Sequence, residues 1–469
     1  MLERLFHLRE NKTTVRTELL AGLTTFMTMA YILAVNPEIL CEGGIPRGGV
    51  FIATALAAVV GTVLMAVFSN YPFVLAPGMG LNAFLTWSVI KIMGYSWQFA
   101  LLAVFVEGLL FFLLSVTPIR QTIFESIPTS IKKAVSAGIG LFICFIALQN
   151  AHIVVESSAT LVDSVNFRSV PFQTQGISAI LALVGTLAVG VMLAFRLKGA
   201  ILFGILLTWI LGMIAQATGI YVPDYQTYFP LYPKLSFAGI AEAFEGFSET
   251  FGGIFDPNAW SHSVDGQMTV GWALVRSMDF FVVMFALFFV DIFDTLGTLI
   301  GVSMKAGFLD KQGRLPRISG ALYADSIATS VGAVFGTSTT TTFVESAAGV
   351  AAGGRTGLTG LTAAALFLLS IFLAPVFLVI PSFATAPALI IVGYEMLSSI
   401  VDLDWKDARE SLPAFITLAW MPFTYSISDG IMFGIISYTV VNALSGRARK
   451  VSPIMYVLTV VFIAKYALI

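Results

Sequence analysis

Charged side chains are scarce in this chain of 469 residues, where Asp, Glu, Lys and Arg together account for only 11%. Soluble globular domains carry about 25% charged residues, so this scarcity argues against a soluble fold. Hydrophobic residues make up 57% of the sequence, and the mean hydropathy is +0.90. These values predict a polytopic helical membrane protein. The formal net charge of −2 gives no reason to expect a nucleic acid partner.

Cysteine and histidine are nearly absent as well. The two cysteines, Cys41 and Cys144, match no ligand or redox spacing, so we expect no disulfide, metal or cofactor. The three histidines, His7, His152 and His262, lie outside the apolar segments, which argues against a histidine proton relay in a membrane. A coupling proton would then be carried by a buried carboxyl group. Residues 1–18 lack a small-residue cleavage site and are not expected to be a cleaved signal peptide.

Apolar segments recur in two groups of about seven. The first group covers residues 19–39, 50–68, 74–89, 99–114, 131–148, 177–193 and 200–217. The second covers residues 273–302, 321–334, a broken segment at 341–352, 357–376, 386–400, 412–425 and 431–444. An acidic loop, residues 221–272, separates the groups, and residues 454–469 form either a further span or an interfacial helix. The sequence therefore predicts about 14 transmembrane segments in an all-α fold.

The distribution of charge predicts the orientation of the chain. Most of the 25 basic residues fall on one side if the N-terminus is cytoplasmic, and the acidic loop then lies outside. This bias follows the positive-inside rule for a multi-pass protein of the inner membrane. Because seven spans per half is an odd number, the two halves must have opposite orientations.

Internal spacing supports two related halves. In the first segment of each half, Asn36 and Asp291 follow a methionine at the same distance. In the fifth segment, Gly140 and Gly393 each follow a proline by twelve residues. These matches favour an inverted repeat of seven plus seven segments.

The third segment of each half is interrupted. Residues 71–84, YPFVLAPGMGLNAF, contain two prolines and two glycines that prevent a regular helix. Residues 336–357, GTSTTTTFVESAAGVAAGGRTG, are too rich in Gly, Ser and Thr to be a firm spanning helix. An exposed loop is the alternative interpretation of the second stretch, although apolar runs flank it. Paired interruptions in inverted halves are the best sequence indication of a transporter's midplane site.

These interruptions predict a polar chamber. A helix that begins inside the membrane presents free N–H groups and a partial positive charge to a ligand. Glu345 is the only carboxylate of the tenth segment, and Thr341 and Thr342 share its helical face. Asn82 in the third segment offers both a donor and an acceptor, although a helix-capping role suits it equally.

The eighth segment, FVDIFDTLGT, carries a second constellation. Asp291, Asp294, Thr295 and Thr298 follow helical spacing and share one face of an apolar span. Carboxylates inside a membrane are costly and usually mark an ion, proton or substrate pathway. The structural alternative is that Asp291 or Asp294 only accepts the free N–H groups of the broken segments.

Other residues in the apolar segments carry weaker expectations. Glu107 and Asp325 look like lone carboxylates. Hydrogen bonds from neighbouring hydroxyl groups explain each of them better than a functional role does. Phe84, Phe293 and Phe343 stand beside the polar positions and could stack on a flat ligand. Because the chain has 40 Phe residues, ordinary packing is the better interpretation of any single one.

Five long motifs carry a family resemblance. They are RTELLAGLTTFMTMAYILAVNPEIL, APGMGLNAF, FVDIFDTLGTLIGV, KAGFLDKQGRLPRISGALYADS and GTSTTTTFVESAAGVAAGGRTGLT. The chain resembles the AzgA-like purine permeases, a branch of the nucleobase-cation symporter superfamily that includes uracil and xanthine permeases. The similarity covers residue 1 to about residue 458.

The resemblance implies an architecture and an activity. A core domain would comprise residues 1–117 and 273–378, a gate domain residues 118–220 and 379–450, with an extracytoplasmic loop at 221–272 and a C-terminal hydrophobic helix at 451–469. The core would move against the gate like an elevator. The implied activity is uptake of purine nucleobases with protons across the lipid bilayer, in a chain that could form a homodimer.

The resemblance also implies site residues. The family's substrate site would fall on Asn82, Asp291, Asp294 and Glu345, with Glu345 matching the glutamate that holds the nucleobase in uracil permeases. The histidine that follows one turn after the acidic position of their eighth helix is Thr295 here. The carrier of the coupling proton therefore stays open among these residues. Asn82 with Asp291 favours adenine over hypoxanthine and guanine.

Two rival classes fit the sequence less well. A related elevator fold serves sulfate and bicarbonate transporters, but clustered carboxylates would repel an anion. An intramembrane aspartyl protease would need a GxGD motif, which is absent, and its two aspartates would face each other across two helices. No HExxH or GxSxG motif occurs either, so we do not expect an enzyme.

Overall fold

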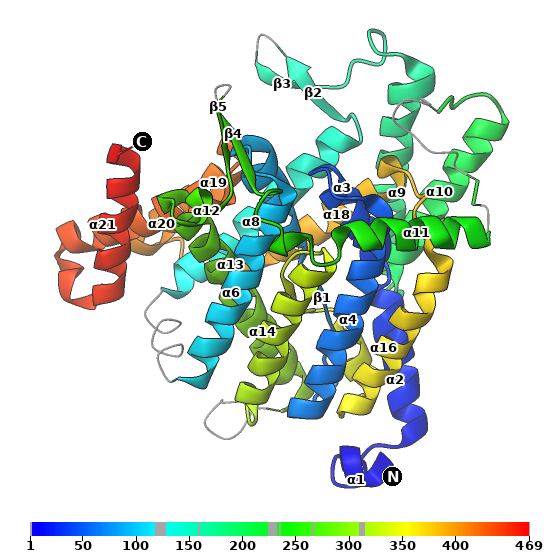
Figure 1. Cartoon of the computed structure of the whole chain (residues 1–469), viewed down its shortest axis with the longest axis horizontal. Coiled ribbons are helices and arrows are strands. Elements are labelled where there is room, and N and C mark those ends of the chain that lie inside the picture. Colours follow the sequence, from blue (N-terminus) through cyan, green and yellow to red (C-terminus); the bar gives the residue numbers. More distant parts are fainter. Residues whose placement is uncertain are drawn as a thin grey trace.

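The computed structural model describes residues 2–117, 128–157, 160–223, 232–233, 236–264, 267–308 and 315–468. Within these residues, ten helices are long and apolar enough to cross a membrane, which makes the chain a multi-pass membrane protein. Figure 1 shows the helices side by side, with the N-terminus at one end of the bundle and two hairpins at the other. Three further apolar helices are shorter, so the count of about 14 spans stays a prediction.

The elements have the following bounds. The longer helices are α2 (Val15–Met29), α3 (Ile32–Cys41), α4 (Arg47–Ser69), α6 (Trp97–Val116), α8 (Thr129–Asn150), α9 (Ile177–Ala194), α10 (Ala200–Ala217), α11 (Phe237–Thr250), α13 (Met278–Ala306), α14 (Ile318–Phe335), α16 (Gly357–Ser370), α18 (Ser382–Leu397), α19 (Ala408–Thr424), α20 (Ile427–Asn442) and α21 (Pro453–Leu468). The shorter helices are α1 (Leu2–Phe6), α5 (Met79–Ala83), α12 (Trp272–Val275), α15 (Ser346–Ala351) and α17 (Ala374–Phe377). Tighter or wider helical turns are η1 (Phe84–Ile92), η2 (Phe172–Gly176), η3 (Gly253–Phe255), η4 (Ile371–Leu373), η5 (Ser398–Asp402), η6 (Ala443–Arg447) and η7 (Ala448–Lys450). The strands are β1 (Leu75–Pro77), β2 (Val154–Ser157), β3 (Leu161–Ser164), β4 (Ser261–Val264), β5 (Gln267–Val270) and β6 (Thr340–Thr342).

The two interrupted stretches pair as strands in the interior. β1 runs antiparallel to β6, with Ala76 opposite Thr341, and all residues of both strands are buried. At the ends of the pair, the N–H of Gly78 donates to the carbonyl of Thr339 at 2.9 Å and that of Phe343 to the carbonyl of Val74 at 3.0 Å. The N–H and C=O groups of an extended backbone that is shielded from water need hydrogen-bond partners, and each stretch supplies them to the other. The fold is mostly helical, as the sequence predicts, and this strand pair and the hairpins β2–β3 and β4–β5 are short extended additions that the sequence did not predict.

Two groups of helices, each drawn from both halves of the chain, form the bundle. In the first group, α14 packs against α4 and α6, and α16 packs against α2 and α4. In the second group, α18 packs against α8, α9 and α10, and α19 packs against α8 and α20. A Cβ on Gly140 would lie 2.7 Å from the carbonyl oxygen of Gly393, and one on Gly393 would lie 2.5 Å from that of Gly140. The backbones of α8 and α18 are thus in direct contact where these helices cross.

The segment predicted as a long loop contains regular structure. α11 lies across α4, as Figure 1 shows, and β4 pairs with β5. The hydroxyl of Thr250, at the end of α11, donates to the carbonyl of Phe335 at 3.1 Å. The N–H of Ser96 donates to the carbonyl of Ser261 at 2.8 Å. The segment therefore binds the ends of α6 and α14 instead of leaving the bundle.

A buried carboxylate fixes the start of α16. Glu18 on α2 is 0% exposed. One of its oxygens accepts the N–H groups of Thr356 and Thr359, both at 3.2 Å, and their hydroxyls at 2.8 and 2.6 Å. Its other oxygen accepts the N–H of Arg355 at 2.9 Å. Glu18 thus satisfies N–H groups that a helix start leaves free, and it ties α2 to α16.

Replacing Glu18 by Ala should strongly destabilise the protein, because five donors lose their acceptor in the interior. A hydrogen bond to a charged group contributes about 1.5–3 kcal/mol, so the loss of several should lower the melting temperature clearly. Thermal unfolding in detergent, followed by tryptophan fluorescence, measures this. The matched control is Glu10→Ala at an exposed position, which should melt like the wild type. Equal melting of both variants would contradict the proposed role of Glu18.

Candidate functional site

A cavity of about 550 Å³ lies between the two helix groups. One wall comes from the start of α3, the ends of β1 and β6, α13 and α15, and the other from α8, α18 and η5. The polar and aromatic residues that line it include Tyr31, Asp294, Phe343, Glu345 and Glu395. Cavities of about 300–1,000 Å³ with a few converging polar groups are typical of small-molecule sites.

Glu345 occupies the turn between β6 and α15. Because β6 ends at Thr342 and α15 begins at Ser346, the turn places the carboxylate on the cavity wall. The hydroxyl of Tyr31 donates to Glu345 Oε1 at 2.6 Å and fixes the orientation of the carboxylate. The Ser346 hydroxyl accepts the N–H of Val74 at 3.0 Å and holds the turn against β1. α15 has only six residues, so its dipole adds little, and the carboxylate itself is the main feature for recognition.

Asp294 on α13 belongs to the same wall. It lines the cavity together with Thr298, one turn further along α13. A smaller cavity of about 300 Å³ shares both residues and extends to Lys132 and Lys133 on α8. The structure therefore brings Asp294 and Glu345 to one space, together with Thr342.

Asn82 and Phe84 lie behind the wall. The Asn82 amide donates to the side-chain oxygen of Asn36 and accepts the hydroxyl of Ser338. Phe84 is 0% exposed and packs within the hydrophobic core. Phe343 does line the cavity, whereas the side chain of Phe293 lies outside the described part of the structure.

Asp291 also lies away from the cavity, in a polar cluster of its own. Asp291 and Thr295 are both 0% exposed, and their side chains are 3.4 Å apart. The Thr295 hydroxyl is 2.6 Å from that of Thr341 and donates to Asp325 at 2.7 Å. Asp325 in turn accepts the N–H of Thr342 at 3.1 Å.

The hydroxyls of Thr295 and Thr342 satisfy Asp325, as expected from the sequence, but its bond to a backbone N–H was not predicted. The alternative role considered for the aspartates of α13, the acceptance of N–H groups from a broken segment, is performed by Asp325 on α14. A carboxylate in an apolar helix was the available signal, but nothing in its spacing connects it with residues 341 and 342. Only the tertiary packing of α14 against β6 does so.

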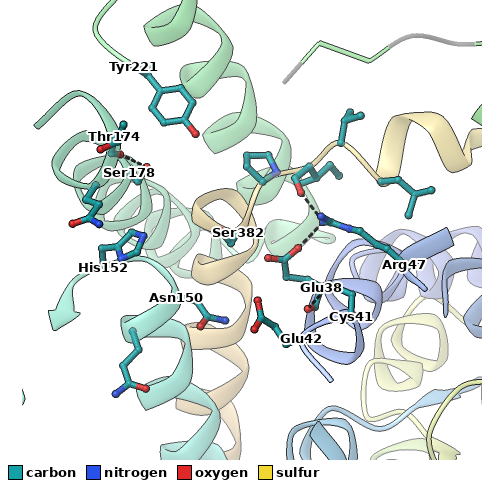
Figure 2. Close-up of a pocket in the computed structure, with 16 residues that line it drawn as sticks. Glu38, Cys41, Glu42, Arg47, Asn150, His152, Thr174, Ser178, Tyr221 and Ser382 are labelled. Carbon is teal, nitrogen blue, oxygen red and sulfur yellow. Dashed lines mark hydrogen bonds and ion pairs between the residues drawn. The ribbon is translucent and has the colours of Figure 1, made fainter. Parts of the chain in front are cut away.

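A second cavity, of about 570 Å³, lies at the other end of α3 and α18 (Figure 2). Its lining includes Glu38, Cys41, Arg47, His152 and Ser382. Figure 2 shows Arg47, from the start of α4, bonded both to Glu38 on α3 and to the segment before Ser382. Burial lowers the pKa of His152, which is partly buried at the end of α8.

Arg47 joins the two helix groups beside this second cavity. Its guanidinium pairs with Glu38 at 2.5 Å and donates to the carbonyl of Ile380 at 3.0 Å. Arg47 and Glu38 belong to α4 and α3, whereas Ile380 precedes α18. The contact closes the bundle at the end opposite to Glu345.

Comparison with known proteins bears on the role of these sites. The model of the xanthine and uracil permeases, described as a permease family, matches residues 16–433. The guanine/hypoxanthine permease PbuO of Bacillus subtilis (strain 168) is 41% identical over 98% of this chain and 98% of its own length. The adenine permease AdeP of Escherichia coli (strain K12) is 38% identical over 100% of this chain and 96% of its own length.

A solved structure shares the fold. The transmembrane domain of the cyanobacterium bicarbonate transporter BicA matches with a TM-score of 0.61 at 14% identity, over 89% of this chain and 97% of that one. At this identity the likeness concerns the fold alone. The relatives are permeases, so the chain is not an enzyme, and the resemblance predicted from its motifs is confirmed. With a match over most of its length, the chain belongs to the xanthine/uracil permease family.

Proposed function

We propose that this chain imports purine nucleobases, with adenine favoured and hypoxanthine or guanine as alternatives, and that Glu345 is the central substrate ligand. The observation that carries the proposal is the position of Glu345, a partly buried carboxylate on the wall of a 550 Å³ cavity, held by the Tyr31 hydroxyl at 2.6 Å. The names of the relatives, which specify guanine, hypoxanthine and adenine, support this substrate class.

The chemistry of a purine suits this cavity. Its ring and exocyclic N–H groups are donors, and an ionised carboxylate can accept two of them at once. Tyr31 uses one acceptor site of Glu345 Oε1 and leaves Oε2 available. Phe343 offers an aromatic ring on the same wall, and Asp294 a second acceptor.

Residues behind the wall take supporting roles in this proposal. Asn82 and Thr341 hold the strands in place through their hydrogen bonds, and Phe84 packs the core. Asp291 lies in the buried cluster, away from the cavity. The direct binding of a purine by Asn82 or Asp291 stays a prediction from the sequence.

Alternating access completes the proposal. The first helix group, from residues 1–117 and 273–378, would be a core that moves against a gate from residues 118–220 and 379–450, in a seven-plus-seven inverted repeat whose third and tenth segments are broken. Support comes from two cavities at opposite ends of α3 and α18, both between the two groups. In an inner membrane with a cytoplasmic N-terminus, the end of α15 would lie on the cytoplasmic side, because Gly353 after α15 packs against Thr17 near the start of α2.

Glu345→Gln should weaken purine binding by roughly tenfold to a hundredfold. Gln keeps the shape of the side chain but loses the charge, and a hydrogen bond to a charged group contributes about 1.5–3 kcal/mol. Binding of adenine, hypoxanthine and guanine to the purified protein by calorimetry measures the effect.

The matched variant for this experiment is Tyr31→Phe. It keeps the Glu345 charge but removes the hydroxyl that orients it, so the loss should be smaller, about two- to tenfold. If Glu345→Gln binds all three purines as tightly as the wild type, the placement of the substrate in this cavity is wrong.

Purine uptake should follow an inward proton gradient and not a sodium gradient. Carboxyl groups gather inside the described part of the bundle, among them Asp291, Asp294 and Glu345, and such groups can bind and release protons. Uptake of labelled adenine into proteoliposomes, with either gradient imposed alone, is the measurement. Uptake that is driven by sodium alone and is unaffected by a protonophore would refute proton coupling.

Arg47→Ala should open the cavity of Figure 2, because the variant loses the bonds to Glu38 and Ile380. Cys41 lines this cavity and reports its access. Each lost hydrogen bond contributes about 0.5–1.5 kcal/mol, so labelling of Cys41 by a membrane-impermeant maleimide should become about two- to tenfold faster.

The control for this labelling is Lys91→Ala. It breaks the exposed ion pair with Glu42 near the same cavity but leaves the bond to Ile380 intact. Labelling that rises equally in both variants, or in neither, would argue against Arg47 as the contact that holds this end closed. A Cys41→Ala variant gives the background from Cys144.

A further inference from the structure

Three carboxyl groups from three helices meet in the interior, behind the wall that carries Glu345. Glu107 lies on α6, Asp291 on α13 and Asp325 on α14, and all three are 0% exposed. Among the described residues, the charged neighbours of Asp291 are acidic, namely these two groups and Asp294. We infer that Glu107 and Asp291 share one proton and together form the proton-carrying site of the transport cycle. This inference rests on the proposed function.

Asp325 needs no proton, because donors surround it. The Thr295 hydroxyl donates to one of its oxygens at 2.7 Å. The N–H and the hydroxyl of Thr342 donate to the other oxygen at 3.1 and 3.3 Å. A carboxylate with three donors is satisfied in its ionised form. Asp325 is therefore a fixed negative charge beside the other two carboxyl groups.

Glu107 and Asp291 lack such donors. The Thr339 hydroxyl lies 3.5 Å from one oxygen of Glu107, and the Thr295 hydroxyl lies 3.4 Å from one oxygen of Asp291. Thr295 has a single hydroxyl hydrogen and stands closer to Asp325. The remaining oxygens, Glu107 Oε1 and Asp291 Oδ2, are buried and have no donor among the described residues. Two ionised groups in this position would be uncompensated charges in the interior.

A proton shared by Glu107 and Asp291 removes one of these two uncompensated charges. The two carboxyl groups lie within hydrogen-bonding reach of each other, and because ionised carboxylates only accept, a bond between them forms only if one of the pair carries a hydrogen. The proton binds one carboxyl oxygen and bridges to the other, which leaves the pair with one negative charge instead of two. Its release leaves two like charges in contact, which then repel each other.

The pair is connected to the substrate cavity. Asp291 lies one turn from Thr295, whose hydroxyl is 2.6 Å from that of Thr341 on β6. β6 leads directly to the turn that carries Glu345. Repulsion between α6 and α13 would therefore act on the strand that positions the substrate ligand. This contact path explains how proton release and substrate release can be linked.

The test is Glu107→Gln, in which an amide N–H replaces the shared proton permanently. The variant should still bind purine and exchange it across proteoliposome membranes in counterflow, since the Glu345 cavity is untouched. With an inward gradient of one pH unit, a one-proton symporter accumulates substrate up to about tenfold. The variant should only equilibrate, at a ratio of about one, and a pyranine signal should detect no purine-dependent proton influx.

A second variant separates proton loss from structural damage. Asp291→Asn should give the same phenotype, and the double variant should be no worse than either single one, because both remove the same proton. If each substitution instead caused an independent structural defect, the double variant would be worse than either single variant. Should Glu107→Gln fail to fold, Asp291→Asn alone decides the question by the same two signals.

The control is Glu410→Gln, a partly buried carboxylate on α19 that accepts hydroxyls from Ser130 and Tyr438. It should keep gradient-driven accumulation. Accumulation and proton influx retained in Glu107→Gln and Asp291→Asn would overturn the inference while leaving the proposed function intact. A wild type that binds purine but moves no protons would overturn both proton coupling and this site.

Discussion

The hydrogen-bonded pair of β1 and β6 is the constraint on which the rest of the structure depends. The N–H and C=O groups of two short extended stretches in the buried interior cannot bond to water. Each stretch therefore supplies hydrogen-bond partners to the backbone of the other. This pairing places Gly78 and Glu345 at the ends of the strands, beside one cavity. It also places the hydroxyl of Thr341 against that of Thr295 on α13. Thr295 therefore connects the strand with the buried carboxyl cluster.

The sequence predicted the parts of this arrangement that depend on composition and local pattern. The apolar segments, the two interruptions and the position of Glu345 next to polar residues could all be read from it. The pairing of residues 75 and 342 could not, because strand register across the chain leaves no local periodicity. The same holds for Asn82, whose partners Asn36 and Ser338 lie far away in sequence. Tertiary contacts decide which side chains face the cavity.

Two polar clusters flank the strand pair, and their chemistry differs. Around Asn82, the amide of Asn36 donates to the hydroxyls of Thr54 and Thr337 at 2.6 and 3.0 Å. Amides both donate and accept, so this cluster is saturated at any physiological pH. Around Asp291, the polar groups are carboxyl groups instead of amides. The number of protons that these groups bind depends on pH. The side of the strand pair that carries Asp291 is therefore the one that can respond to protons.

The contact between Gly140 and Gly393 limits how this permease family member can change its specificity. Side chains adjust to a neighbouring mutation by changing rotamer, but a backbone contact has no such freedom. Even one added methyl group would force α8 and α18 apart, and with them the wall of the cavity that faces Glu345. The spacing of these two helices is thus fixed by their backbones. Specificity on this side of the cavity could change only through the side chains that the helices present, such as Val392 and Met396.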